Sequence, residues 1–317
     1  MLTVLLATRN RSRVFTSVLE SFCRLRSPSS GWKLLVVDNG STDQTSQLIA
    51  SFVSRLPLQS VTEPTPGKNF ALNAGLAFVE GDLVVLTDDD VFPREDWLIR
   101  LRHAADAQPE FSIFGGSVVP HWEIPPPYWI QWADQGAVFA ITDPSWRDGP
   151  IAPNCIWGPN MAIRSEVFRS DIRFNPSMGP RGSNYLQGGD TELTRRLYQQ
   201  GHKAWHVREA VVEHFIRKEQ MDRGWVMQRA IRHGRGEYRL GHANEITSRK
   251  LLLGTPRYLY RKLYNEARDM TKAWLMRKQE DLFRSHWRFN YVRGQIREVR
   301  ALARERSART YSATPTS

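Results

Sequence analysis

The first hundred residues alternate between short apolar runs and longer amphipathic stretches. The apolar runs begin at Leu2, Trp32 and Gly81, and each is short enough to form one buried strand. Apolar residues recur at helical spacing over 12–25, 45–56 and 69–79. This order of strand and helix, with strands that are apolar on both faces, predicts an α/β fold with a mainly parallel sheet flanked by helices.

The pattern changes in the second half of the chain. Residues 115–185 are rich in Trp, Pro and Gly, which predicts irregular structure with a strand near 155–164 on the same sheet. A capped helix is expected over 188–201, followed by short strands over 203–215. Beyond about residue 217 the chain is expected to be helical and basic to its end.

Composition is typical of a globular protein and argues against a membrane-spanning one. Of its 317 residues 41% are hydrophobic, and no apolar run approaches the roughly 20 residues that span a bilayer. The start lacks the basic-then-apolar order of a signal peptide, and two cysteines, Cys23 and Cys155, predict no disulfide framework. A cytoplasmic location is therefore expected.

Charge is distributed unevenly along the sequence. Residues 1–214 hold 20 Lys and Arg against 23 Asp and Glu, whereas residues 215–317 hold 24 against 10, a net charge of +14. Such an asymmetry usually indicates an anionic partner. Nucleic acid and the anionic face of a membrane both qualify.

Three consecutive carboxylates, Asp88, Asp89 and Asp90, follow one of the predicted strands. One interpretation is an acidic turn in water. The other is a site for a divalent cation, because adjacent carboxylates resist ionisation unless a cation offsets them, and Mg²⁺ and Mn²⁺ prefer oxygen ligands. Ligands of parallel sheets bind at the carboxyl ends of the strands, where this cluster and Asp38 both fall, which favours the cation site.

Five sequence blocks in order resemble the family 2 glycosyltransferases of the GT-A fold. They are "VVDNGSTDQT" (36–45), "GKNFALNAGL" (67–76), "LTDDD" (86–90), "GPNMAIRSEVF" (158–168) and "GGDTELTRRL" (188–197). The resemblance covers roughly residues 2–217 and implies a GT-A, Rossmann-like catalytic domain over 1–217. Its nucleotide-sugar half is expected over 1–100 and its acceptor half over 101–217, with a basic helical extension over 218–317.

The resemblance also implies an activity and roles for the acidic cluster. The chain is expected to be an inverting enzyme that transfers a sugar from a nucleotide-diphosphate donor and depends on Mn²⁺ or Mg²⁺. Asp88 corresponds to the residue near the nucleotide ribose and Asp90 to the metal ligand, with Asp89 as a neighbour of undefined role. Asp38 is expected to accept a hydrogen bond from a uracil or thymine base, although its sequence "DNGSTD" also fits a turn.

Further donor contacts are expected from the first strand and the third helix. Thr8 and Arg9 lie beside the nucleotide pocket in the resemblance. Lys68 and Asn73 are expected either to reach the diphosphate or to solvate the helix that carries them.

Asp190 corresponds to the catalytic base of the family, which removes the proton from the acceptor hydroxyl. The alternative role is an N-cap of the predicted helix. The Glu that commonly precedes this base is replaced by Gly189, which leaves the acceptor contact of that Glu unfilled. Glu192 and Trp157 are the candidate acceptor contacts, although a Trp is as readily a core residue.

His214 follows an apolar pair near the end of the resemblance. It is expected to be a further metal or diphosphate ligand, as a His at this distance from the base is in several GT-A enzymes. A structural His at a strand end is the alternative.

Three other functions compete with this interpretation. A nucleotidyltransferase that makes the activated sugar would need a Gly-rich loop after the first strand, and "ATRNRSR" contains no glycine. A nucleic-acid-binding protein fits the sequence pI of about 9.9 but not the acidic cluster. A non-catalytic partner subunit would not need Asp38, Asp88, Asp90 and Asp190 together.

The basic extension contains a candidate membrane-binding helix over 257–283. Its apolar stripe is expected to comprise Tyr260, Tyr264, Ala267, Met270, Trp274 and Leu275. Basic residues flank the stripe, and each contributes on the order of 1 kcal/mol at an anionic lipid surface. The alternative is that the stripe packs against the catalytic domain or a second subunit. A lipid-linked sugar or another glycan is the expected acceptor.

Overall fold

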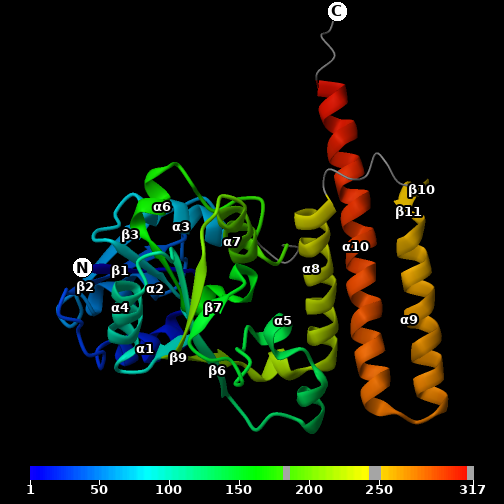
Figure 1. Cartoon of the computed structure of the whole chain (residues 1–317), viewed down its shortest axis with the longest axis horizontal. Helices are drawn as coiled ribbons and strands as arrows, with labels where there is room; N and C mark the ends of the chain where they lie inside the picture. The colour runs from blue at the N-terminus through cyan, green and yellow to red at the C-terminus, as the bar shows by residue number, and fades with distance from the viewer. Residues whose placement is uncertain (181–185, 243–250, 313–317) are drawn as a thin grey trace, which may run out of the picture. The chain divides into compact units, whose positions relative to one another are not determined.

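The computed structural model describes residues 1–180, 186–242 and 251–312, and their contacts divide the chain into two units (Figure 1). The first unit comprises Met1–Glu123, Gln135–Ser183 and Gly189–Ile216. The second comprises Ile124–Asp134, Asn184–Gly188 and Arg217–Ser317. The division after Ile216 separates the main sheet from the long basic helices.

Nine strands form the main sheet within the described part of the first unit, in the order β3-β2-β1-β4-β8-β6-β9-β5, with β7 also paired to β9. The strands are β1 (Leu2–Thr8), β2 (Trp32–Asp38), β3 (Leu58–Thr62), β4 (Leu83–Leu86), β5 (Val91–Pro93), β6 (Ile113–Trp122), β7 (Gly149–Ile151), β8 (Met161–Arg164) and β9 (Ala204–Ile216). The first four run parallel, as do β6 and β9, whereas β8, β5 and β7 pair antiparallel with their neighbours. The predicted mainly parallel α/β sheet is confirmed.

Helices cover both faces of this sheet. They are α1 (Ser12–Phe22), α2 (Thr45–Ser51), α3 (Lys68–Leu76), α4 (Trp97–Ala107), α5 (Gln135–Phe139), α6 (Ser165–Arg169) and α7 (Gly189–Gln199), with single turns at Pro153–Cys155 and Gly158–Asn160. Side chains of β1 alternate between two cores, because Val4 packs with residues of α1 and α4, whereas Leu5 packs with residues of α3, α6 and α7. This period-two alternation between two apolar layers explains why the strands are apolar throughout.

The short strands expected over 203–215 are one strand of 13 residues, β9. It is this long because it pairs with β6 along its length and with both β5 and β7 on its other side. The register shifts at Gly116 and Ser117, where the side chain of Asn160 donates to the carbonyl oxygens of Ser117 and Ala210 at 2.9 and 2.8 Å. Asn160 therefore joins the irregular part of both strands to the segment before β8.

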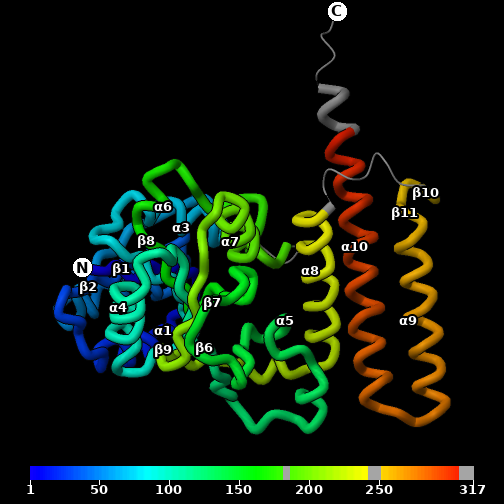
Figure 2. Tube along the Cα trace, viewed as in Figure 1, coloured from blue at the N-terminus to red at the C-terminus, as the bar shows by residue number. Residues whose placement is uncertain are grey.

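Three long helices make up most of the described second unit: α8 (Arg223–His242), α9 (Arg257–Leu275) and α10 (Gln279–Ser312). Short turns at Tyr128–Trp132 and Lys218–Met221 and a hairpin of β10 (Leu251–Leu252) and β11 (Thr255–Pro256) complete it. Helix α10 packs against both α8 and α9, as the trace in Figure 2 shows. At Gly294 the backbones approach so closely that a Cβ would lie 2.2 Å from the carbonyl oxygen of Ile231.

A buried carboxylate also ties α10 to α8. Glu298 is fully buried and accepts hydrogen bonds from the guanidinium groups of Arg235 and Arg239, at 2.9 and 2.5 Å. Removing one partner of such a set is strongly destabilising, because a buried charge is left uncompensated. None of the helices in the described part of the chain is long and apolar enough to cross a membrane.

Candidate active site

The carboxyl ends of β1, β2 and β4 bring the predicted donor-site residues to one edge of the sheet. Thr8 pairs with Asp38 at the last position of the β1–β2 ladder. On the other side of β1, Leu5 pairs with Leu86, the last residue of β4, and the three aspartates follow two positions later. The parallel register thus gathers Thr8, Asp38 and the aspartates, which are far apart in sequence.

The middle aspartate is the most constrained of the three. The hydroxyl of Thr8 donates a hydrogen bond to Asp89 Oδ2 at 2.7 Å, and Arg11 Nε lies 3.5 Å from Asp89 Oδ1. Burial and the neighbouring charge of Asp90 raise the pKa of Asp89 to about 6, although Arg11 and Thr8 oppose this shift. The pKa of Asp89 thus reflects burial beside a like charge, which the guanidinium of Arg11 only partly offsets.

Arg11, at the start of α1, is one of the cations that face the cluster. Its second contact joins Nη2 to Asp90 Oδ2 at 3.6 Å. Burial disfavours the charged guanidinium, but Asp89, Asp90 and Asp88 raise the pKa of Arg11 above its ordinary value. Arg11 thus stays charged beside three carboxylates.

Lys68, the first residue of α3, donates a hydrogen bond from Nζ to Asp88 Oδ1. Burial disfavours its ammonium charge, but Asp88, followed by Asp190 and Asp90, raises the pKa of Lys68 above its ordinary value. Lys68 is therefore held charged by the carboxylates of Asp88, Asp190 and Asp90. Its contact with the diphosphate of a donor stays a prediction.

His214 lies next to Asp90 because β9 pairs with β5, in which Val91 is opposite His214. Its Nδ1 is 2.7 Å from the carbonyl oxygen of Phe139, which can only accept, so Nδ1 carries the proton. Nε2 then points to Asp90 Oδ1 at 3.6 Å. Burial opposes protonation of the ring, but Asp90 raises the pKa of His214 above its ordinary value.

The pair of Asp90 and His214 has the chemistry of a partial metal site. A metal-binding His usually donates its other ring N–H to a backbone carbonyl or carboxylate, as His214 does to Phe139. Among the described residues, no three His, Cys, Asp or Glu side chains form a complete ligand set by themselves. Mg²⁺ and Mn²⁺ are commonly held by one or two protein ligands together with substrate phosphates, so the residues present fit such an ion.

Asp190 lies in the first turn of α7 rather than at its N-cap, because the helix begins at Gly189. Its Oδ2 accepts a hydrogen bond from the backbone N–H of Gly158 at 2.8 Å. A Cβ on Gly158 would lie 2.8 Å from the same oxygen, so a side chain at this position would displace the carboxylate. The carboxylate is thereby oriented by the segment before β8.

Gly189, which replaces the Glu common in the family, packs against Asn69. A Cβ at this position would lie 2.8 Å from Asn69 Nδ2. Asn69 is not free to move, because Nδ2 donates to the carbonyl oxygens of Asn175 and Met178 at 2.8 and 3.1 Å. The space for a side chain at position 189 is therefore filled by α3.

Asp38 and its neighbour build the loops around the strand ends. Asp38 accepts hydrogen bonds from the N–H of Ser41, at 2.9 Å, and from the hydroxyl of Ser46. Asn39 Nδ2 donates to the carbonyl oxygens of Glu63 and Thr65, and Asn39 Oδ1 accepts from Gly67 N–H at 2.7 Å. The turn expected as an alternative for Asp38 is present, and its contact with a nucleotide base stays a prediction.

The remaining predicted residues have structural partners or lie at the surface. Asn73 exchanges two hydrogen bonds with the backbone of Phe174, both at 2.8 Å, and Glu192 pairs with Arg196 at 2.9 Å within α7. Trp157 is partly buried against the sheet core, and Arg9 is exposed just after β1. Their roles in donor or acceptor binding stay predictions.

Two residues, one facing the site and one buried behind it in the sheet, had no role in the sequence interpretation. Arg11 faces the acidic cluster, and the only sequence signal for it was its place in the arginine-rich stretch after the first strand. Asn160 is fully buried, and its Oδ1 accepts from Trp97 Nε1 at 2.8 Å. Its presence in the block "GPNMAIR" was visible, but not its contacts with distant strands.

A cavity of about 700 Å³ in the first unit lies away from these residues. It is lined by Ile151 and Ala204, which pair at the start of β9, and by Tyr198 near the end of α7. Asp90 and His214 are at the other end of β9, and Asp190 is at the other end of α7. The candidate site is therefore defined by its charged side chains and not by this cavity.

Comparison with solved structures shows the same fold. Mannosyltransferase PcManGT from Pyrobaculum calidifontis, in complex with GDP-Man and Mn²⁺, is 19% identical over 99% of this chain and 81% of its own, with a TM-score of 0.57. TarS 1–349 from S. aureus, in complex with UDP-GlcNAc, is 16% identical over 93% of this chain and 90% of its own, with a TM-score of 0.55. The α/β fold is that of GT-A glycosyltransferases.

Sequence comparison identifies the family. Glycosyltransferase AglE of Haloferax volcanii is 22% identical over 86% of this chain and 88% of its own length. The glucosyl-dolichyl phosphate glucuronosyltransferase of the same organism is 23% identical over 53% of this chain, which spans about half, 54%, of that relative. Residues 3–170 match the family described as Glycosyl transferase family 2. The chain therefore belongs to glycosyltransferase family 2.

Proposed function

We propose that this glycosyltransferase is an inverting, metal-dependent enzyme that moves a sugar from a nucleotide-diphosphate donor to a hydroxyl group of a glycan or lipid-linked acceptor. The observation that carries the proposal is the orientation of Asp190 by Gly158 N–H, with the ammonium of Lys68 held in the field of Asp190 and Asp88. A carboxylate, a cation and an acidic cluster are thus close enough to act on one substrate.

In this proposal the donor binds along the carboxyl ends of β1, β2 and β4. Asp38 accepts from the base, Asp88 contacts the ribose, and Thr8 and Asp89 shape the floor of the pocket. Lys68 neutralises the diphosphate, while Arg9 and Asn73 are the outer donor contacts. The proposed donor is a UDP- or dTDP-sugar. Structural relatives carry UDP-GlcNAc and GDP-Man, which supports a nucleotide sugar in general.

Asp90 and His214 are proposed to hold a divalent cation together with the donor phosphates. Mn²⁺ or Mg²⁺ bound there would stabilise the negative charge that develops on the departing diphosphate. The contact of His214 Nδ1 with Phe139 supports this assignment, because it fixes Nε2 toward Asp90. The structural relative PcManGT was solved in complex with Mn²⁺, which also supports a divalent cation.

Asp190 is proposed to be the general base. It takes the proton of the acceptor hydroxyl, whose oxygen forms a bond to the anomeric carbon as the bond from that carbon to the diphosphate oxygen breaks. The electron pair of the broken bond leaves with the nucleoside diphosphate. Attack opposite the leaving group inverts the anomeric configuration.

The acceptor is proposed to be a glycan or a lipid-linked sugar in the synthesis of cell-surface polysaccharide or glycolipid. Glu192 and Trp157 are its candidate contacts. The names of two relatives contain a lipid: dolichyl phosphate in the glucuronosyltransferase of Haloferax volcanii, and diacylglycerol in the beta-monoglucosyldiacylglycerol synthase of Nostoc sp.. We also infer a cytoplasmic enzyme that associates with the inner face of a membrane, because the chain carries a net charge of +14 over 215–317.

A donor screen tests the proposal. The purified chain is given Mn²⁺ and a panel of nucleotide sugars, and released nucleotide is measured with and without chelator. With the donor that is used, Asp190→Asn should bind nucleotide as the wild type does and release it at least about a hundredfold more slowly. Normal turnover of Asp190→Asn, or a retained anomer in the product, would contradict the single-base mechanism. Gel shift with nucleic acid and no nucleotide release would favour a nucleic-acid-binding protein instead.

A further inference from the structure

Helix α9 has one face against α10 and one exposed face. Leu259 and Ala273 of α9 are buried, and Leu263 packs with Val292 and Ile296 of α10. The predicted apolar stripe is therefore divided between the two faces: Tyr260 and Met270 are half-buried, whereas other residues of the stripe are exposed. The packed face is satisfied within the described second unit, so it needs no further partner.

Large apolar side chains remain exposed near the end of α9. Tyr264, Trp274 and Leu275 are 68, 67 and 68% exposed, and Met276 is 53% exposed. Single exposed apolar residues are normal, but an aromatic and two aliphatic residues in sequence at one helix end form a patch. Such a patch indicates an interaction surface.

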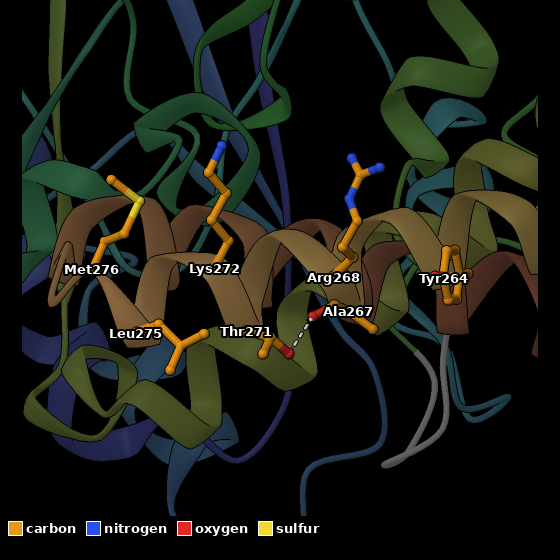
Figure 3. Close-up of a pocket in the computed structure, with 7 residues that line it drawn as sticks. All are labelled: Tyr264, Ala267, Arg268, Thr271, Lys272, Leu275 and Met276. Carbon is orange, nitrogen blue, oxygen red and sulfur yellow. Dashed lines mark hydrogen bonds between the residues drawn. The ribbon is translucent and has the colours of Figure 1, made fainter.

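Cations lie beside Tyr264, Leu275 and Met276 on this helix, whereas Trp274 is at the same helix end but does not line this surface. Figure 3 shows Tyr264, Ala267, Thr271 and Leu275 in a row along the helix, with the side chains of Arg268 and Lys272 extending from it. They line a shallow hollow of about 550 Å³. Exposed aromatic and aliphatic side chains together with Lys and Arg on one helix are the composition of helices that bind a membrane interface.

Charge on α9 and the turn after it is strongly positive. The exposed basic residues are Arg257, Arg261, Lys262, Arg268, Lys272, Arg277 and Lys278. Of the two acidic residues of α9, Glu266 pairs with Arg288 of α10 at 2.9 Å and Asp269 pairs with Arg268 at 3.0 Å. Cations therefore predominate on the exposed surface.

We propose that the exposed face of α9 binds an anionic membrane surface, with Trp274, Leu275 and Met276 in the headgroup region and Arg268 and Lys272 against lipid phosphates. The helix lies parallel to the bilayer, and its 19 residues extend over about 28 Å. A second copy of this chain is a poorer partner, because it would bring the same positive charge to the contact. Anionic lipid is complementary in both charge and apolar character.

The inference rests on the proposed membrane association and names the surface responsible. It explains how an acceptor that remains in a bilayer reaches an enzyme without a spanning helix in its described part. Aromatic rings set the depth of such a helix, and basic residues hold it near anionic headgroups.

Vesicle flotation of the full chain tests the inference. Vesicles contain phosphatidylcholine with about 30% phosphatidylglycerol, or phosphatidylcholine alone, at low salt and at about 0.5 M salt, where charge attraction is screened. The wild type should float with anionic vesicles at low salt and remain in solution in the other conditions. Trp274→Ser with Leu275→Ser, and separately Arg268→Glu with Lys272→Glu, should each lower the bound fraction at least about fivefold.

Matched controls change the same chemistry in the first unit. Val53 and Phe78 are exposed apolar residues, and Val53→Ser with Phe78→Ser should float as the wild type does. Arg24→Glu with Arg169→Glu makes the same change of charge at two exposed arginines of the first unit, and it should also float as the wild type does. Circular dichroism of every variant checks that the helices are retained.

The outcomes distinguish the proposed membrane association of the enzyme from the proposed role of the α9 surface. If the wild type floats and both α9 variants float equally well, the α9 surface is wrong although membrane association holds. If the wild type never floats, membrane association itself is wrong, and nucleotide release in solution still tests the enzyme. If the α9 variants change the oligomeric state without changing flotation, the face is a contact between copies, and the inference is overturned.

Discussion

Asp190 Oδ2 accepts a hydrogen bond from Gly158 N–H at 2.8 Å, and the Cα of Gly158 faces the same oxygen. The N–H of Gly158 and its lack of a side chain together hold the carboxylate in place, because a Cβ at position 158 would lie 2.8 Å from Asp190 Oδ2. The segment before β8 thereby sets where the proposed base points.

We predict that Gly158→Ala slows transfer through a displaced Asp190. The added methyl group must push the carboxylate away from its position, and misplacing a catalytic group by a fraction of an ångström lowers kcat, here by at least about tenfold. Donor affinity should change little, because the proposed donor site lies at the carboxyl ends of β1, β2 and β4. Steady-state kinetics and nucleotide binding measure the two effects.

Gly241→Ala is the control for this substitution. No atom lies within 4 Å of a Cβ at Gly241, so activity should equal that of the wild type. Equal kcat values for the two variants would show that Gly158 does not position Asp190.

Local sequence patterns were sufficient for the strands that begin at Leu2, Trp32 and Leu83 and for the acidic cluster, but not for β3, β5, β6 and β7. The strands that begin at Leu2 and Trp32 are buried on both faces, so their uninterrupted apolar runs identify them. The three aspartates are adjacent, and their place after a strand follows from the order of elements alone. These features need no knowledge of contacts between distant residues.

Long-range contacts account for what the sequence did not predict. Thr8 and Asp89 are 81 positions apart, and nothing local in either segment indicates that they form a hydrogen bond. The packing of Gly189 against Asn69 likewise depends on how α3 and α7 meet. The exposed face of α9 depends on which of its sides α10 covers. The apolar and basic content of that surface was therefore predictable, but the predicted stripe combined residues of the packed and the exposed face.

Metal binding should depend on both Asp90 and His214. Asp90→Ala removes the proposed charged ligand and should abolish transfer, whereas His214→Gln should weaken Mn²⁺ binding in the presence of nucleoside diphosphate about tenfold or more. Electron paramagnetic resonance of Mn²⁺ measures binding, and nucleotide release measures transfer. His103→Gln, a change at an exposed histidine of α4, is the control and should have no effect.

Full activity in the presence of a chelator would contradict a role for a metal. If Asp90→Ala alone lost Mn²⁺ while His214→Gln bound it as the wild type does, His214 would be a structural residue that positions Asp90.

Restoring the family's glutamate at position 189 should destabilise the protein. In Gly189→Glu the new Cβ would lie 2.8 Å from Asn69 Nδ2, and overpacking of this kind costs about 1–3 kcal/mol of unfolding free energy. Asn69→Ala removes the obstructing amide together with its hydrogen bonds to Asn175 and Met178. Urea unfolding of both single variants and the double variant should give a double-variant loss smaller than the sum of the single losses. Additive losses would mean that the two residues do not obstruct each other.

Stability below neutral pH should depend on His206. This residue is 2% exposed, its ring lies 5.6 Å from that of Trp146, and burial lowers the pKa of His206 below the ordinary value of 6.5. The backbone of Gly115 and the charge of Asp148 oppose the shift, and Arg208 adds to it.

The direction of the pH effect follows from the two protonation states. Below about pH 6.5 the unfolded chain binds a proton at His206 while the folded chain does not, so the free energy of unfolding falls as pH decreases, until the folded pKa is reached. His206→Phe keeps an aromatic ring beside Trp146 and removes the proton site. The difference in unfolding free energy between wild type and His206→Phe should therefore be constant above pH 7 and shift in favour of the variant as pH falls below 6.5. Urea unfolding of both proteins from pH 5 to pH 8 measures this difference, and the titration of groups common to both proteins cancels in it. A difference that does not change with pH would show that His206 has the same pKa in the folded and unfolded chains.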